Sequence, residues 1–169
     1  PDQRTVRKAL ERAELVVVQE AFATAETCAF ADILLPATTW GEKEGTVTNS
    51  ERRITRVHAA VAPSGEAQHD WRIALALAKE LGEHEVFKSR AQAMNFNYVS
   101  PEVIWNEHRE STRGRDLDIT GLSYAQLDQH PEQWPMPQGA SSGLKRLYAD
   151  GRFPTPTGKA KFLALDYVP

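Results

Sequence analysis

Short apolar runs alternate with segments of helical spacing along the first part of the chain. Arg4–Ala13 carries apolar residues three and four positions apart, which predicts a helix. Leu15–Val18 and Ile33–Leu35 are continuous apolar runs, and each predicts a buried strand of a parallel sheet. The Ala-rich stretch Thr24–Ala31 predicts a short helix with Thr24 as its N-cap. This order favours an α/β fold with an open, mostly parallel sheet and flanking helices.

The middle of the chain returns to helical spacing after a polar stretch. Glu51–Val57 alternates loosely between apolar and polar residues and predicts an exposed strand. Apolar residues on one face predict a helix over Asp70–Leu81. Another helix is predicted over Pro101–Glu110, because proline suits the first helical position. A shorter helix is predicted over Tyr124–His130.

Prolines gather in the last part of the chain. From Pro131 onward the sequence carries six of its ten prolines, which predicts a long connector with little regular structure. Phe162–Leu165 predicts the first strand of a further element. Because the sequence begins at Pro1 without Met and ends just after this strand, we expect it to be a piece of a larger protein.

Composition narrows the class of protein. The 169 residues are 41% hydrophobic and 25% charged with a net charge of −3, which suits a globular domain. This balance argues against a nucleic-acid partner, since such proteins carry a concentrated basic face. The longest apolar runs are far shorter than the ~18–20 residues that span a bilayer, so no membrane partner is expected.

Metal and catalytic signatures are sparse. The single Cys28 excludes an internal disulfide and an iron–sulfur cluster held by this chain alone, and it is interpreted as a buried small hydrophobe. The five histidines lack the spacing of zinc sites, so no metal ligand is predicted. No Ser-His-Asp or Cys-His arrangement can be nominated, and no catalytic residue is predicted.

Candidate ligand contacts follow the predicted strands. Gln19 and Glu20 come directly after the first strand, where open α/β sheets bind ligands. An acidic side chain there could accept hydrogen bonds from ribose hydroxyls or purine amino groups. The alternative is that both residues belong to a solvated loop.

Two further positions carry a charge suited to a nucleotide. Lys43 lies between Gly41 and Gly45 and could contact a phosphate, although the loop lacks the pattern of a standard phosphate-binding loop. The alternative is a solvated charged turn. Asp70 is either the N-cap of the helix that it begins or a carboxylate that accepts the paired N–H donors of a guanine.

Three strings in order resemble one family. Val16–Thr27, Ala31–Ala37 and Trp40–Arg53 match the pattern "VVVQD-F-TET-YADVVLP…W-EK-GT-TN-ERR" of the molybdopterin oxidoreductases, which hold molybdenum between two molybdopterin guanine dinucleotides. Within this family, Gly114–Tyr124 and Arg146–Ala160 look like the assimilatory nitrate reductases. Formate dehydrogenases rank second, since they usually lack the "GRD-DITGLSY" string. A third reading is a non-catalytic electron-transfer module of the same fold that has lost the pterin.

The resemblance implies roles for the candidate residues. It makes Gln19, Glu20, Lys43 and Asp70 contacts to one guanine dinucleotide, although Glu20 stands where many relatives carry Asp. Asn49, Glu51 and Arg52 belong to the same motif and are interpreted as loop-ordering residues.

The resemblance also implies what the larger protein contains. Residues 1–130 would be the C-terminal part of the central α/β domain, and residues 131–169 a connector into a C-terminal dinucleotide-binding β-barrel domain. A 4Fe-4S cluster and the molybdenum ligand would lie elsewhere in the parent. Nitrate would be the substrate, a protein or subunit the electron donor and the cytoplasm the location, and this chain alone would be inactive.

Overall fold

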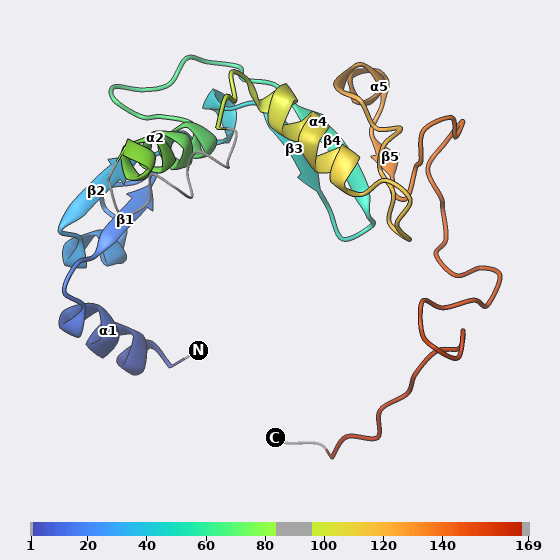
Figure 1. The fold of residues 1–169 in the computed structure, drawn as a ribbon. Coiled ribbons are helices and arrows are strands. Elements are labelled where there is room, and N and C mark those ends of the chain that lie inside the picture. The colour runs from blue at the N-terminus through green and yellow to red at the C-terminus, as the bar shows by residue number, and fades with distance from the viewer. Residues whose placement is uncertain (1, 84–95, 167–169) are drawn as a thin grey trace. The chain divides into compact units, whose positions relative to one another are not determined.

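The computed structural model describes residues 2–83 and 96–166, and the chain divides into two compact units. Unit 1 comprises Pro1–Gly45 and Val57–Ile104, and unit 2 comprises Thr46–Arg56 and Trp105–Pro169. Both units contain helices and strands, so the α/β class is confirmed (Figure 1). Within the described ranges, no helix is both long enough and apolar enough to cross a membrane.

Unit 1 is built on two parallel strands that lie side by side (Figure 1). β1 (Val17–Glu20) and β2 (Ile33–Pro36) pair in register from Val17 opposite Ile33 to Glu20 opposite Pro36. The connection between them contains the 3₁₀ helix η1 (Glu26–Phe30), so the predicted strand–helix–strand order is confirmed. Because the strands are parallel, their carboxyl ends meet at one edge, and Gln19 and Glu20 lie at that edge.

Three local predictions for unit 1 are wrong in detail. The helix between the strands begins at Glu26, and Ala25 precedes it without a side-chain cap, so Thr24 is not the N-cap. The strands are not buried, since Val17 is 48% and Ile33 46% exposed. Apolar runs mark strands covered on both faces, and the described elements of unit 1 leave much of this pair uncovered. Cys28 is only half-buried.

Two α-helices of unit 1 lie within two residues of their predicted bounds. α1 (Gln3–Arg12) is capped by Asp2, whose carboxylate accepts from the Thr5 amide at 3.2 Å. α2 (Asp70–Glu83) starts at the edge where β1 and β2 end. A short parallel bridge between Ala37 and Gln68 brings it there, and the Gln68 amide donates to the Pro36 carbonyl at 3.0 Å.

Unit 2 contains a three-stranded sheet in the order β3 (Gly45–Thr48), β4 (Arg53–Val57) and β5 (Glu132–Gln133). β5 pairs antiparallel with β4, with Ile54 opposite Glu132. The strand predicted over Glu51–Val57 therefore exists, but it is not an exposed strand, because Ile54 is 3% exposed.

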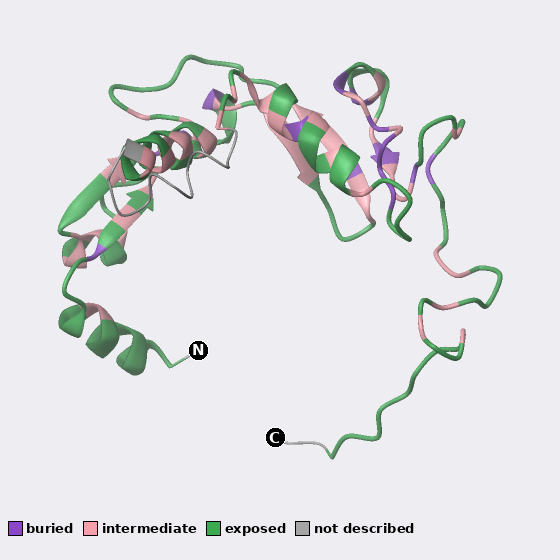
Figure 2. Ribbon diagram, viewed as in Figure 1, coloured by how far each residue is buried: buried purple, intermediate pink, exposed green. Residues whose placement is uncertain are grey.

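Two helices complete the core of unit 2. α4 (Pro101–Ser111) and α5 (Tyr124–Gln129) confirm the predicted helices, and Ser123 caps α5 through the Gln126 amide. The indole N–H of Trp105 donates to the Leu122 carbonyl at 2.7 Å, so this buried donor is satisfied. Figure 2 colours buried residues purple, and those with apolar side chains in unit 2 form one cluster: Ile54, Trp105, Ile119, Leu122, Tyr124, Leu127 and Met136.

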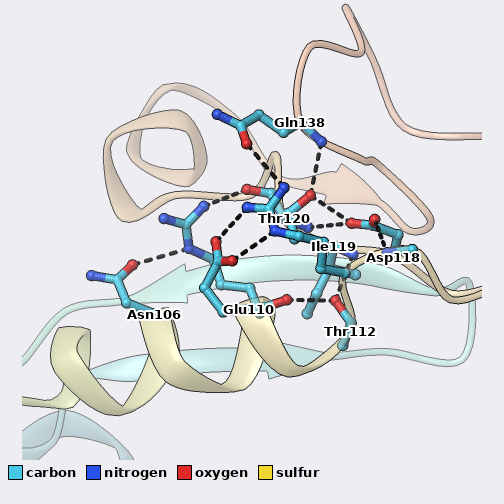
Figure 3. A network of polar contacts seen from close by, with 10 residues as sticks. Asn106, Glu110, Thr112, Asp118, Ile119, Thr120 and Gln138 are labelled. Carbon is cyan, nitrogen blue, oxygen red and sulfur yellow. Dashed lines mark hydrogen bonds and ion pairs between the residues drawn. The ribbon is translucent and has the colours of Figure 1, made fainter.

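A polar network fixes the loop between α4 and α5 (Figure 3). The buried carboxylate of Asp118 accepts from the Thr120 hydroxyl at 2.6 Å, the Thr120 amide at 2.8 Å and the Gly114 amide at 2.8 Å. These hydrogen bonds hold the pKa of Asp118 below its usual value. Thr120 in turn accepts from the Gln138 amide at 2.9 Å, which ties the connector to the loop.

The start of the connector is held by the loop before β4. The Asn49 carboxamide accepts from the amides of Glu51 and Arg53, both at 3.0 Å. The Arg52 guanidinium donates to the Trp134 carbonyl and, at 3.1 Å, to that of Leu144. The loop-ordering interpretation is confirmed for Asn49 and Arg52.

The later connector is irregular, as its prolines predict. Its path beyond β5 consists of turns and bends, coloured orange to red in Figure 1. The strand predicted over Phe162–Leu165 is absent from the described part of the chain, and Phe162 is 92% exposed. A strand needs a neighbour for its backbone groups, and the described residues supply none there.

One close approach in unit 2 yields a prediction. A Cβ atom on Gly143 would lie 1.8 Å from the Gln133 carbonyl oxygen, so the backbone would have to move. We expect Gly143→Ala to lower the free energy of unfolding by about 3 kcal/mol, at the upper end of the usual cost of overpacking. Denaturant unfolding followed by tryptophan fluorescence measures this change. The neighbouring Ser142→Ala is the control, and equal stabilities of the two variants would contradict the close approach.

Candidate functional site

Three of the four predicted site residues meet where β1 and β2 end. The Asp70 carboxylate accepts from the Gln19 carboxamide at 2.7 Å through one oxygen. Its second oxygen accepts from the Lys43 ammonium at 2.6 Å. These residues come from the end of β1, the loop after β2 and the start of α2, so the parallel register and the bridge at Gln68 bring them together.

The charge of Asp70 is set by these two neighbours. Burial raises the pKa of this carboxyl, but hydrogen bonds from Lys43 and Gln19 and the charge of Lys43 outweigh that effect. The pKa therefore lies below the usual 3.8, and Asp70 is ionised at neutral pH. The site thus holds one carboxylate and one ammonium in direct contact.

Asp70 is not the N-cap of α2. The carbonyl of His69 accepts the first helical hydrogen bonds, from the Arg72 amide at 2.8 Å and the Ile73 amide at 3.1 Å. Asp70 is the first residue of the helix, where a negative charge interacts favourably with the helix dipole. Its carboxylate is consequently available to Gln19 and Lys43.

Glu20 does not join this cluster in the structure. Its carboxylate accepts from the amides of Ala21 at 2.8 Å and Phe22 at 3.3 Å, and so caps the turn that follows β1. The sequence predicts Glu20 as a ligand contact because it lies at the end of the first strand. Its position at the end of β1 is confirmed.

The loop that carries Lys43 is ordered by a buried acid. Residues Trp40–Glu42 form the 3₁₀ helix η2, with Thr39 as its N-cap. The Glu42 carboxylate accepts from the Thr39 amide at 2.7 Å, the Thr39 hydroxyl at 2.9 Å and the Ser64 amide at 2.9 Å. These hydrogen bonds, those from Thr39 above all, lower the pKa of Glu42 below its usual 4.5.

A pocket of about 390 Å³ adjoins Lys43. Phe22 and Trp40 contribute aromatic rings to its wall, and they are 63% and 67% exposed. The Lys43 ammonium lies 5.8 Å from the centre of the Trp40 ring. The remaining lining residues are Ala21, Thr38, Thr39 and Gly41.

Sequence reasoning missed these aromatic residues and Glu42. The pattern Thr39-x-x-Glu42 is that of a capping box, in which the acid reaches back to the cap amide, and it could have identified Glu42. Phe22 and Trp40 carry no comparable signal, since single aromatic residues near a turn occur in many sequences.

The cluster and the pocket together can bind a polar ring with a charged tail. The pocket volume falls within the range of about 300–1,000 Å³ typical of small-molecule sites. Lys43 supplies a positive charge at its wall, and Asp70 supplies acceptors for N–H donors. Within the described residues, no group of His, Cys, Asp and Glu side chains could hold a metal ion.

The sequence of the same part of the chain matches a known family. Residues 1–80, which include all four predicted site residues, match the sequence model of the molybdopterin oxidoreductases. Residues 1–80 of the chain therefore belong to the molybdopterin oxidoreductase family. The resemblance noted from its motifs is thereby confirmed.

Curated relatives align with nearly the whole chain. A nitrate reductase from Synechocystis sp. is 38% identical over 96% of the chain and 22% of its own length. The assimilatory nitrate reductase catalytic subunit of Bacillus subtilis is 38% identical, and the alignment covers 100% of the chain and 22% of that subunit. An F420-dependent formate dehydrogenase subunit alpha from Methanocaldococcus jannaschii is 39% identical, and the alignment covers 99% of the chain and 23% of that subunit. The chain thus spans about a fifth of the length of these relatives.

A solved structure agrees on the fold. Acetylene hydratase from Pelobacter acetylenicus superimposes with a TM-score of 0.59 and 24% identity, covering 94% of this chain and 19% of the hydratase. At this identity the likeness concerns the fold alone. It supports the α/β arrangement described for both units.

The Lys43–Asp70 contact predicts a measurable titration. Because the pKa of Asp70 is lowered in the folded chain, its stabilising contribution is present above the pKa of the unfolded state and is lost as pH falls through the lowered value. We expect the Asp70 carboxyl to titrate below 3.8, and Lys43→Met to raise that midpoint because burial then acts with less opposition. Carbon-13 NMR of the side-chain carboxyl measures both midpoints. Identical midpoints in the two proteins would contradict the contact.

Proposed function

We propose that this chain forms part of the catalytic subunit of a molybdenum-dependent nitrate reductase, which reduces nitrate to nitrite. Within it, the chain contributes contacts to one molybdopterin guanine dinucleotide and performs no catalysis alone. The observation that supports this proposal is the cluster of Gln19, Lys43 and Asp70, which lies at the strand ends beside the pocket that Lys43 lines. Open α/β sheets bind nucleotides at this edge.

The residues present fit such a nucleotide. The Asp70 carboxylate matches the paired N–H donors of a guanine edge, and the Gln19 carboxamide can turn to pair with a neighbouring polar atom. Lys43 reaches both Asp70 and the pocket wall, so its ammonium can exchange a carboxylate oxygen for a phosphate or ribose oxygen. Glu20 would order the turn beside the ligand through the Ala21 amide.

The chemistry of the parent enzyme would come from the metal. When bound, the molybdenum cofactor supplies the centre that accepts an oxygen atom from nitrate, with electrons delivered through a 4Fe-4S cluster elsewhere in the parent. The residues of this chain would bind and orient the dinucleotide and keep its charged tail paired. None of them is proposed to move a proton in the reaction.

A formate dehydrogenase is the second candidate. The F420-dependent formate dehydrogenase relative is as similar to the chain as the nitrate reductases are. The string Gly114–Tyr124 favours nitrate reductase by resemblance, yet its residues Asp118 and Thr120 serve the polar network of unit 2. The string is therefore evidence of similarity to the nitrate reductases, and it does not identify a residue that contacts the substrate. A non-catalytic module without the pterin is disfavoured by the retained Lys43 and Asp70.

The proposal includes the substrate, the electron donor and the location of the parent protein. An electron-donor protein or subunit, nitrate as substrate and a cytoplasmic location are expected from the nitrate reductase resemblance. The division into a central α/β part over residues 1–130 and a connector over 131–169 also stays a prediction.

Substitution of the cluster tests the proposal in the full-length parent. We expect Lys43→Ala and Asp70→Ala each to lower nitrate reduction with reduced viologen at least about tenfold, because each removes a charged group that is proposed to hydrogen-bond the dinucleotide. The content of guanine dinucleotide should fall with it, measured as GMP released by acid hydrolysis.

The exposed Lys8 on α1 gives a matched control, and Lys8→Ala should keep both values. Full activity and full GMP content in Lys43→Ala and Asp70→Ala would show that the cluster is not the dinucleotide site. Formate oxidation without nitrate reduction would replace the first candidate by the second.

A further inference from the structure

Glu42 is an acid beside the proposed ligand that does not face it. Its side chain is buried, at 8% exposure, although the residues on either side of it contact solvent or the pocket. Its neighbours Gly41 and Lys43 both line the pocket, while Glu42 itself does not. The carboxylate points back into unit 1, where it meets two backbone amides.

Both oxygens of this carboxylate are used as acceptors. One takes the Thr39 amide and hydroxyl, and the other takes the Ser64 amide, a residue 22 positions further along the chain. Only an ionised carboxylate presents acceptors on both sides. A glutamine at this position would turn its NH₂ group toward one of the two amides and leave a buried donor unpaired.

These bonds join the two segments that build the site. Thr39 belongs to the loop whose members line the pocket, and Ser64 belongs to the segment that leads to Asp70. The Gly41 carbonyl adds two further links, from the Ala60 amide at 2.8 Å and the Val61 amide at 3.0 Å. The position of Lys43 relative to the pocket therefore depends on a charge that no ligand would touch.

We propose that Glu42 is a positioning residue: its ionised carboxylate fixes the loop from Thr39 to Lys43 against Ser64, and thereby sets the reach of Lys43 toward Asp70 and the bound dinucleotide. The inference rests on the proposed function of Lys43. It predicts that neutralising Glu42 weakens dinucleotide binding through Lys43, without removing any group that contacts the ligand.

A double-mutant cycle in the full-length parent tests the inference. The variants are Glu42→Gln, Lys43→Gln and the pair together, with the exposed Glu66→Gln as the matched control. The readouts are GMP released by acid hydrolysis and the midpoint of thermal unfolding. We expect Glu42→Gln to lower the GMP content at least about tenfold while the protein stays folded, and Glu66→Gln to leave the content unchanged.

The cycle separates positioning from a merely structural role. If Glu42 acts through Lys43, adding Glu42→Gln to Lys43→Gln causes no further loss of GMP. Losses that multiply, or a Glu42→Gln variant with the full content of GMP, overturn the inference. Full GMP content in Lys43→Gln instead defeats the proposed site itself, so the two failures are distinct.

A milder pair of variants covers the case in which Glu42→Gln does not fold. Thr39→Val removes the hydroxyl that donates to Glu42 at 2.9 Å, and Thr39→Ser keeps it. We expect Thr39→Val to lose GMP in the wild-type background but not in the Lys43→Gln background, and Thr39→Ser to restore the content. Equal GMP content in Thr39→Val and Thr39→Ser overturns the inference.

Discussion

The pairing of Asp70 with Lys43 and Gln19 is the interaction that gathers the candidate site, and it depends on the parallel register of β1 and β2. Register puts Gln19 at one edge, and the bridge between Ala37 and Gln68 carries the start of α2 to the same edge. A parallel pair in any other register would move Gln19 away from the Asp70 carboxylate. The chemistry of the site is therefore a consequence of backbone pairing several residues away.

The charged side chains at the candidate site of unit 1 differ in how far they are buried. Asp70 and Lys43 are partly exposed and can exchange partners with a ligand, whereas Glu42 is buried and satisfied by backbone amides. An exposed ion pair contributes little to stability, so exchanging it costs little. A buried carboxylate with both oxygens bonded resists change. This combination gives a fixed loop that carries a replaceable contact.

Helix positions and the parallel strand order could be predicted from sequence because both depend on local spacing of apolar residues, as over Asp70–Leu81. The burial of the strand residues could not be predicted. Val17 and Ile33 would need covering elements, which the described residues of unit 1 do not supply. The candidate residues Gln19, Lys43 and Asp70 could be found from strand ends and family motifs. Their mutual contacts could not, since these depend on the bridge at Gln68, which no sequence pattern marks.

The uncovered parallel pair has a practical consequence for handling the chain. Within the described ranges β1 and β2 pair with no other strand, although the Pro36 carbonyl of β2 accepts from the Gln68 amide, so each strand presents a row of backbone donors and acceptors along its outer edge. Their apolar side chains flank those rows, as at Val17 and Leu34, and β1 contains no lysine or proline to discourage a second chain. Two copies could add strand to strand at this border. Fusion to a solubilising carrier, or dilute refolding, is therefore the sensible route to the isolated chain.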